Sequence, residues 1–143
     1  MASIVELREM TTAKLETKLE DAREELFNLR FQRASGRLED YSRLREVRRE
    51  IAQLQELLHK RQLAAEVAAQ HPQVASVLAG KTWSAVASFS YEDSAWNVQF
   101  TDDDGRDLAS AKVNLNQAKP SGRRARRNKP QSQLVTSYVI AGK

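Results

Sequence analysis

The chain of 143 residues contains no cysteine, and histidine occurs only at His59 and His71. Without thiols it can form no disulfide, no cysteine-ligated zinc site and no thiol nucleophile. The two histidines lack a metal-ligand spacing and accompany no recognisable nucleophile motif, so we interpret both as solvated surface residues. These absences leave no candidate catalytic residue, metal site or cofactor. The sequence therefore predicts a protein that is not an enzyme.

Long hydrophobic runs are also absent. No apolar segment approaches the roughly 20 residues that span a bilayer, and the first residues lack the basic start and apolar centre of a secretion signal. We therefore expect a cytoplasmic protein. The net charge is only +4, from 23 basic and 19 acidic residues, but residues 81–143 hold ten basic against six acidic residues. This uneven placement points to an anionic partner, with nucleic acid as the leading candidate.

The first half of the chain predicts two helices. Residues 12–32 and 44–58 each place apolar side chains at alternating spacings of four and three, along one stripe of a helix. Between them Gly36 can adopt the left-handed conformation that ends a helix, and Glu39 and Asp40 favour the start of the next one. The simplest outcome is an antiparallel hairpin with the two stripes facing each other. The stripe residues are Leu15, Leu19, Ala22, Leu26 and Leu29, then Leu44, Val47, Ile51, Leu54 and Leu58.

The second half predicts strands. Helical composition continues to His71, where the following Pro72 favours an end to the helical half. Beyond Gly80 the apolar period becomes two, which is typical of strands with one buried face. The fold class is therefore mainly α: a long antiparallel two-helix hairpin, followed by a small strand-rich (β) C-terminal extension. The strands are expected at Trp83 to Tyr91, Trp96 to Phe100, Ala109 to Leu115 and Leu134 to Ile140, with a turn at residues 102–105.

Basic residues surround the predicted inter-helix loop, and the hairpin brings them to one end. Guanidinium groups contact phosphates, and small loop residues let a backbone approach RNA closely. The alternative is a solvated helix face on which Glu46 and Glu50 pair with Arg49 and its neighbours. From charge pattern alone the two interpretations stay open. The candidate RNA-binding residues here are Arg30, Gln32, Arg33, Ser35, Gly36, Arg37, Arg45, Arg48 and Arg49.

Two further features have a functional and a structural interpretation. Phe27 and Phe31 lie one position off the main stripe, and we expect them to pack against the second helix or the C-terminal segment, with contact to RNA or a neighbouring protein as the alternative. The polar segment 119–130 is predicted to be a basic loop that binds RNA, or else a solubilising segment. Its candidate RNA-binding residues are Arg123, Arg124, Arg126, Arg127 and Lys129.

Three stretches carry a family resemblance. Residues 24–32 (EELFNLRFQ), 34–38 (ASGRL) and 44–52 (LREVRREIA) closely resemble bacterial large-subunit ribosomal protein twenty-nine. With the opening VELR, the match covers about the first 65 residues in order. One departure is Lys14, three positions after the capping Thr11, where the family often has an acidic residue. Thr11 or Thr12 could still cap the helix alone.

The resemblance implies a helical hairpin on large-subunit ribosomal RNA near the peptide exit tunnel, beside ribosomal protein twenty-three. It implies a structural role in translation on cytoplasmic ribosomes, without catalysis, cofactor or membrane. It says nothing of residues 81–143. We divide the chain into a ribosomal hairpin at 1–66, a helical tail and linker at 67–82, and a strand-rich extension at 83–143. The alternative function is a coiled-coil adaptor, because such stripes also pair with helices of other proteins.

Overall fold

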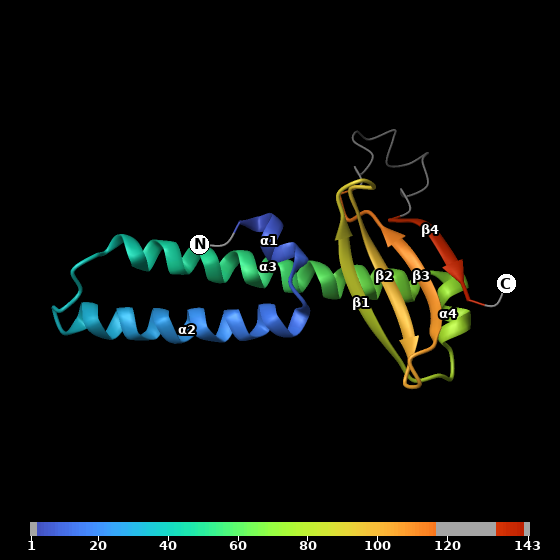
Figure 1. Cartoon of the computed structure of the whole chain (residues 1–143), viewed down its shortest axis with the longest axis horizontal. Helices are drawn as coiled ribbons and strands as arrows, with labels where there is room; N and C mark the ends of the chain where they lie inside the picture. Colours follow the sequence, from blue (N-terminus) through green and yellow to red (C-terminus); the bar gives the residue numbers. More distant parts are fainter. Residues whose placement is uncertain (1–2, 117–133, 142–143) are drawn as a thin grey trace, which may run out of the picture. The chain divides into compact units, whose positions relative to one another are not determined.

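A computed structural model describes residues 3–116 and 134–141 of the chain. The chain divides into two compact units, residues 1–60 and residues 61–143, and helix α3 runs through the boundary (Figure 1). The predicted fold class, helices followed by a strand-rich extension, is confirmed. The elements are α1 (Ile4–Glu9), α2 (Thr12–Ala34), α3 (Ser42–Gln70), α4 (Pro72–Leu78), β1 (Trp83–Ser90), β2 (Ala95–Asp102), β3 (Asp107–Val113) and β4 (Val135–Ile140).

In the first unit, α2 and the first part of α3 form the predicted antiparallel hairpin (Figure 1). The predicted stripes supply most of its buried side chains, which are Leu15, Leu19, Ala22, Leu44, Val47 and Leu54. Leu26, Leu29 and Ile51 are only half-buried. On α3 the structure buries Leu57, 2% exposed, in place of the predicted Leu58. Helix α1 contributes Leu7, 1% exposed, so the unit has a third helix that a two-stripe pattern does not include.

Two side-chain caps fix the first helices. The Ser3 hydroxyl accepts from the Glu6 backbone N–H at 3.3 Å, and the Glu6 carboxylate accepts from the Ser3 N–H at 3.0 Å, so α1 begins with a reciprocal capping box. For α2, Thr11 caps alone, its hydroxyl accepting from the Lys14 N–H at 3.4 Å. Capping by Thr11 without an acidic partner is therefore confirmed.

Helix α3 ends at Gln70, so the predicted break at His71-Pro72 is confirmed, but the prediction that the helical half ends there is wrong. Pro72 is the first residue of a further helix, α4, because proline at the first helical position loses no intrahelical hydrogen bond. His71 is also not a solvated surface residue: it is half-buried, with its ring centroid 4.9 Å from that of Tyr138 on β4. His59 is exposed, as predicted.

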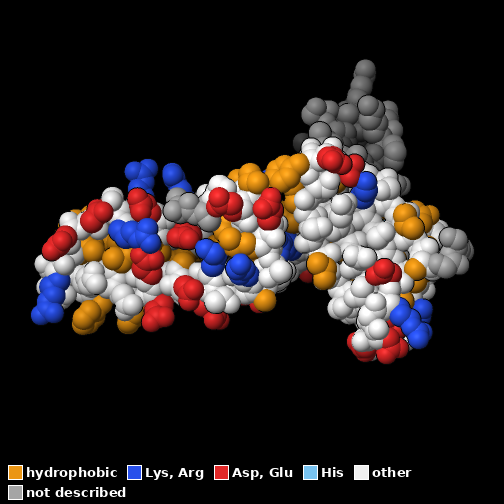
Figure 2. Space-filling model, viewed as in Figure 1, with side chains coloured by type: hydrophobic (Ala, Val, Ile, Leu, Met, Phe, Trp, Pro, Cys, Tyr) orange, Lys and Arg blue, Asp and Glu red, His pale blue; other side chains and the backbone are white. Residues whose placement is uncertain are grey.

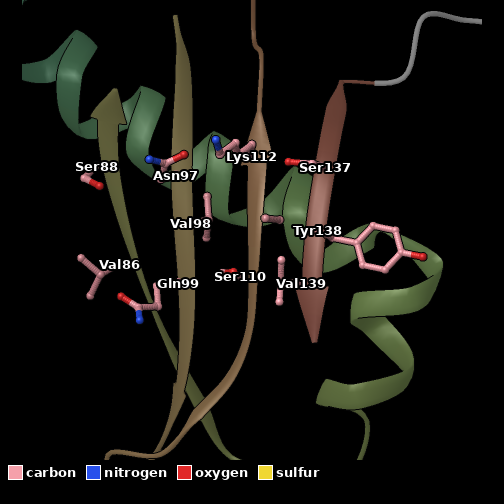
Figure 3. A pocket seen from close by; sticks show the side chains of 11 residues that line it. Val86, Ser88, Asn97, Val98, Gln99, Ser110, Lys112, Ser137, Tyr138 and Val139 are labelled. Atoms are coloured by element: carbon pink, nitrogen blue, oxygen red, sulfur yellow. The ribbon is translucent and has the colours of Figure 1, made fainter. Parts of the chain in front are cut away.

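The second unit is an antiparallel sheet in the order β1-β2-β3-β4, with helical segments on one face. In Figure 3 the last turns of α3 pass behind the strands, and α4 lies beside the end of β4. The register places Ala87, Val98 and Ala111 in one row, and Ala85, Phe100 and Ala109 in the next. All but Ala85 are buried. The alternation of apolar residues read from the sequence therefore marks the covered face of the sheet. The predicted turn at residues 102–105 is confirmed, and Gly105 there has φ +76°.

Candidate nucleic-acid interface

The loop end of the hairpin is held by hydrogen bonds within the loop itself. After α2, the Gly36 N–H donates to the Arg33 carbonyl at 3.2 Å, and the Arg37 N–H donates to the Gln32 carbonyl at 2.8 Å. This pair of bonds, with Gly36 at φ +72°, is a Schellman ending. Glycine is needed for the backbone conformation and not for space, since a Cβ here would meet no atom within 4 Å.

Helix α3 starts with a carboxylate that accepts two hydrogen bonds. The Asp40 carboxylate accepts from the Ser42 N–H at 2.8 Å and from the Ser42 hydroxyl at 2.6 Å. These bonds, the hydroxyl first, hold the pKa of Asp40 below its ordinary value, and the positive charge of Arg43 acts in the same direction. Acidic character at this helix start, expected from Asp40, is thus found in the structure.

One arginine near the loop is used to join the two helices. The Arg43 guanidinium on α3 donates to both carboxylate oxygens of Glu25 on α2, through Nε at 2.6 Å and Nη2 at 3.0 Å. Its Nη1 also lies 3.2 Å from Glu46. These carboxylates raise the pKa of Arg43. Arg43 is therefore a cross-helix clasp, and it occupies the Glu46 carboxylate that the alternative interpretation had paired with Arg49.

The predicted RNA-binding residues of the hairpin are all exposed. The Ser35 hydroxyl is partly used, because it donates to the carbonyls of Phe31 and Gln32 at 3.1 and 3.2 Å. Within the described residues, none of the six arginines forms an ion pair with a carboxylate. The interpretation as a solvated face of acid-base pairs therefore fails for these six side chains. They are Arg30, Arg33, Arg37, Arg45, Arg48 and Arg49.

On α3 the free arginines share one surface. Arg45, Arg48 and Arg49 stand at helical spacings of three and four, which places them on one face. Arg45 and Arg49, together with Ser42 and Glu46, line a shallow hollow of about 370 Å³. Two unpaired guanidinium groups beside a hollow offer hydrogen-bond donors of the kind that phosphates accept. Figure 2 shows basic, acidic and hydrophobic side chains interspersed over the helices, so the local pairing of charges decides which cations are available.

The expected packing of Phe27 and Phe31 is wrong. Both side chains are 69% exposed in the structure, so neither packs against α3 or the C-terminal segment as the favoured interpretation held. Their spacing puts them on one face of α2 together with Arg30, between them in sequence. The signal was present in their one-position offset from the buried stripe. An apolar pair beside an unpaired arginine suits a surface that is covered in an assembly.

Part of the predicted site lies outside the described residues. The basic loop with Arg123, Arg124, Arg126, Arg127 and Lys129 falls within residues 117–133, so its role stays a prediction. In the described ranges, no group of three or more acidic or histidine side chains is arranged to hold a metal ion. No helix among these residues is long and apolar enough to cross a membrane.

Known proteins match the hairpin. Residues 5–61 match the family described as Ribosomal L29 protein. The large ribosomal subunit protein uL29 of Geobacillus stearothermophilus is 52% identical over 60 residues, which are 42% of this chain and 91% of that protein. The chain belongs to the ribosomal L29 family. The uL29 of Natranaerobius thermophilus is 52% identical over 58 residues, 41% of this chain and 89% of the relative. That of Bacillus cytotoxicus is 50% identical over 58 residues, 41% and 88%.

The L29 match and the arginine surface coincide. Every predicted hairpin residue, from Arg30 to Arg49, lies inside residues 5–61. The sheet, which starts at Trp83, lies outside them. The resemblance to the ribosomal family is therefore confirmed. The residues beyond the match form an extension about which the family says nothing.

Proposed function

We propose that this chain binds large-subunit ribosomal RNA through the loop end of its hairpin, near the peptide exit tunnel and beside ribosomal protein twenty-three. As a member of the ribosomal L29 family, the chain is a structural component of the large ribosomal subunit and is associated with cytoplasmic ribosomes. Proteins of this family are structural, and we propose no catalytic role.

The observation that carries the proposal is the set of six unpaired, exposed arginines at one end of the hairpin. An unpaired arginine can turn toward a phosphate without giving up an ion pair, whereas Arg43 must first leave its carboxylates. The exposed Phe27 and Phe31 add apolar area that gains from being covered by a base or a protein surface. Arginine and phenylalanine together suit RNA, which offers both phosphates and unstacked bases.

The coiled-coil adaptor is the weaker alternative. Its apolar stripe has a partner inside the chain, because Leu15 and Leu19 of α2 and Leu54 of α3 are buried in the hairpin. The turn at Gly36, with φ +72°, folds the two stripes back on each other. An external helix would have to displace this packing.

The test measures affinity for deproteinised large-subunit ribosomal RNA across a salt titration. A variant with Arg45, Arg48 and Arg49 all replaced by alanine should bind more weakly, and the slope of log affinity against log salt should fall by about one for each phosphate that is no longer neutralised. Arg23→Ala, which removes an exposed arginine of α2 outside the set, is the matched control and should change neither quantity. An unchanged slope in the triple variant would contradict RNA binding at this surface.

Assembly is tested separately by sedimentation of cell lysate with detection of this chain. Co-migration with the large subunit after a high-salt wash is expected, and recovery only in the soluble fractions would remove the ribosomal role. Crosslinking from the assembled subunit then tests the place beside protein twenty-three. A crosslink to that protein is expected if the hairpin occupies the position that the family resemblance implies.

A further inference from the structure

The extension has a sheet edge and an open sheet face. β1 is at one end of the strand order, and no other described strand pairs with its outer side. On the face away from the helical segments, the register forms two rows of four side chains, one from each strand (Figure 3). These rows line a shallow hollow of about 330 Å³. The first row is Val86, Gln99, Ser110 and Val139, and the second is Ser88, Asn97, Lys112 and Ser137.

The β1 edge lacks the features that normally prevent strand addition. Its eight residues, Trp83–Ser90, include no charged residue and no proline, and its pairing with β2 runs without a register shift. Exposed edges in natural sheets are usually blocked by charge, proline or bulges. The opposite edge is different: β4 has six residues, its pairing with β3 shifts register near Val113, and its Tyr138 ring lies 4.9 Å from that of His71. The regular, unguarded edge is therefore β1.

Charge around this edge selects the partner. Residues 81–116 contain six acidic and three basic residues. Glu92 and Asp93 follow the end of β1, while Asp102 pairs in register with Trp83 at its start and continues into Asp103 and Asp104. The cation on the open face, Lys112, is already paired with Asp93 at 2.6 Å. Among the described residues, the acidic ones without an ion pair, Glu92 at one end and Asp102, Asp103 and Asp104 at the other, outnumber the nearby Lys81 and Arg106. A phosphate backbone would therefore be repelled here, whereas a basic polypeptide would be attracted.

We propose that β1 is a docking edge for an extended, basic segment of a partner protein, which adds to the sheet as a fifth strand. Main-chain hydrogen bonds to the outer side of β1 supply the affinity, as in other cases of strand addition. On the helix-covered face, the added strand places apolar side chains beside Trp83, which is 42% exposed; on the open face it lies beside Val86, 64% exposed. Lysine or arginine at both ends of the segment meets the acidic turns. This proposal goes beyond RNA binding by the hairpin.

The first test uses the purified full-length chain and a labelled peptide in which threonine and valine alternate between paired lysines at each end. Fluorescence anisotropy should detect binding, and Val86→Lys should weaken it at least about tenfold, because a charge in an edge strand opposes strand addition. Val139→Lys is the matched control: this side chain stands in the same row at the opposite edge and is 66% exposed. It should leave the affinity within about twofold. A peptide with glutamates at its ends should bind more weakly than the lysine peptide.

Several results would overturn the proposal: no binding of the lysine peptide, equal loss in both valine variants, or tighter binding of the glutamate peptide. The second test places a photo-crosslinking amino acid at position 86 in purified large subunits that contain the chain. A crosslink to a protein segment with basic residues on both sides supports the proposal. A crosslink to ribosomal RNA or to a second copy of the chain contradicts it. Because the peptide test needs no ribosome, its failure is separable from failure of the ribosomal role.

Discussion

The two units of this chain hold themselves together in different ways. The sheet unit buries the aromatic side chains Phe100 and Trp96 on the covered face of the sheet. The hairpin unit buries leucine, valine and alanine side chains, and it leaves Phe27 and Phe31 exposed. Helices packed along a seam bury narrow stripes, whereas a sheet with a covered face buries a whole side of each strand. The two units therefore differ in their aromatic side chains: the sheet unit buries two of them, while the hairpin leaves its phenylalanine pair uncovered.

The largest effect is expected in the sheet unit. Phe100→Ala should lower the free energy of unfolding by about 3 to 5 kcal/mol, because this side chain is 0% exposed and contacts the Trp83 ring edge-on at 5.3 Å. Both tryptophans lie in this unit, so denaturant titration by tryptophan fluorescence reports on it directly. Helical circular dichroism, followed in parallel, should shift less. Equal shifts by both probes would break the distinction between the two units.

A slightly smaller effect is expected in the hairpin. Leu54→Ala should cost about 2 to 5 kcal/mol, since Leu54 is 0% exposed in the seam. Leu26→Ala is the matched substitution at a half-buried seam position and should cost clearly less. The measurement is the midpoint of helical circular dichroism against denaturant. If both substitutions lower the free energy of unfolding equally, the seam is packed as tightly at Leu26 as at Leu54. The partial exposure of Leu26 would then not mark a weaker part of the hairpin.

The smallest effect concerns the start of α3 and depends on pH. The folded-state pKa of Asp40 is lowered, chiefly by the Ser42 hydroxyl, so its carboxylate stabilises the fold at neutral pH. This contribution is lost as the pH falls below the ordinary aspartate value and through the lowered pKa. The Asp40→Asn variant should therefore lose less stability on acidification than the parent chain does. The measurement is helical circular dichroism between about pH 5 and pH 2. An identical acid profile for Asp40→Asn and the parent chain would show that Ser42 does not hold this carboxylate.

Much of this structure could be predicted because burial leaves a period in the sequence. The stripe through Leu15 and Leu19 and the alternation through Trp96 and Val98 give the hairpin and the sheet. A period does not say where a third helix packs, so Leu7 and the burial of Leu57 were not anticipated. Nor does a period show whether Pro72 ends the helical half or begins a further helix, because proline is common both after the end of a helix and at its first position.

The candidate site could be predicted in part. The arginines at the loop end follow from the hairpin geometry alone, since both helices bring them there. Which arginine forms an ion pair could not be predicted, because Arg43, Arg45 and Arg49 all stand in the same charged stretch of sequence. Only the position of Glu25 on the other helix selects Arg43 as the clasp. The exposure of Phe27 was predicted wrongly, since an offset of one position places a side chain at the border of a seam.

At the Gly36 turn, the groups that hold the backbone differ from the groups that are exposed to a partner. The N–H groups of Gly36 and Arg37 are used to end α2, so the backbone here keeps its form without help from a partner. The surface that a partner contacts is then set by side chains such as Arg33. Its carbonyl takes part in the turn, but its guanidinium group does not. A change in a partner surface here can be met by substitutions among the arginines alone. The turn itself can stay constant while the affinity evolves.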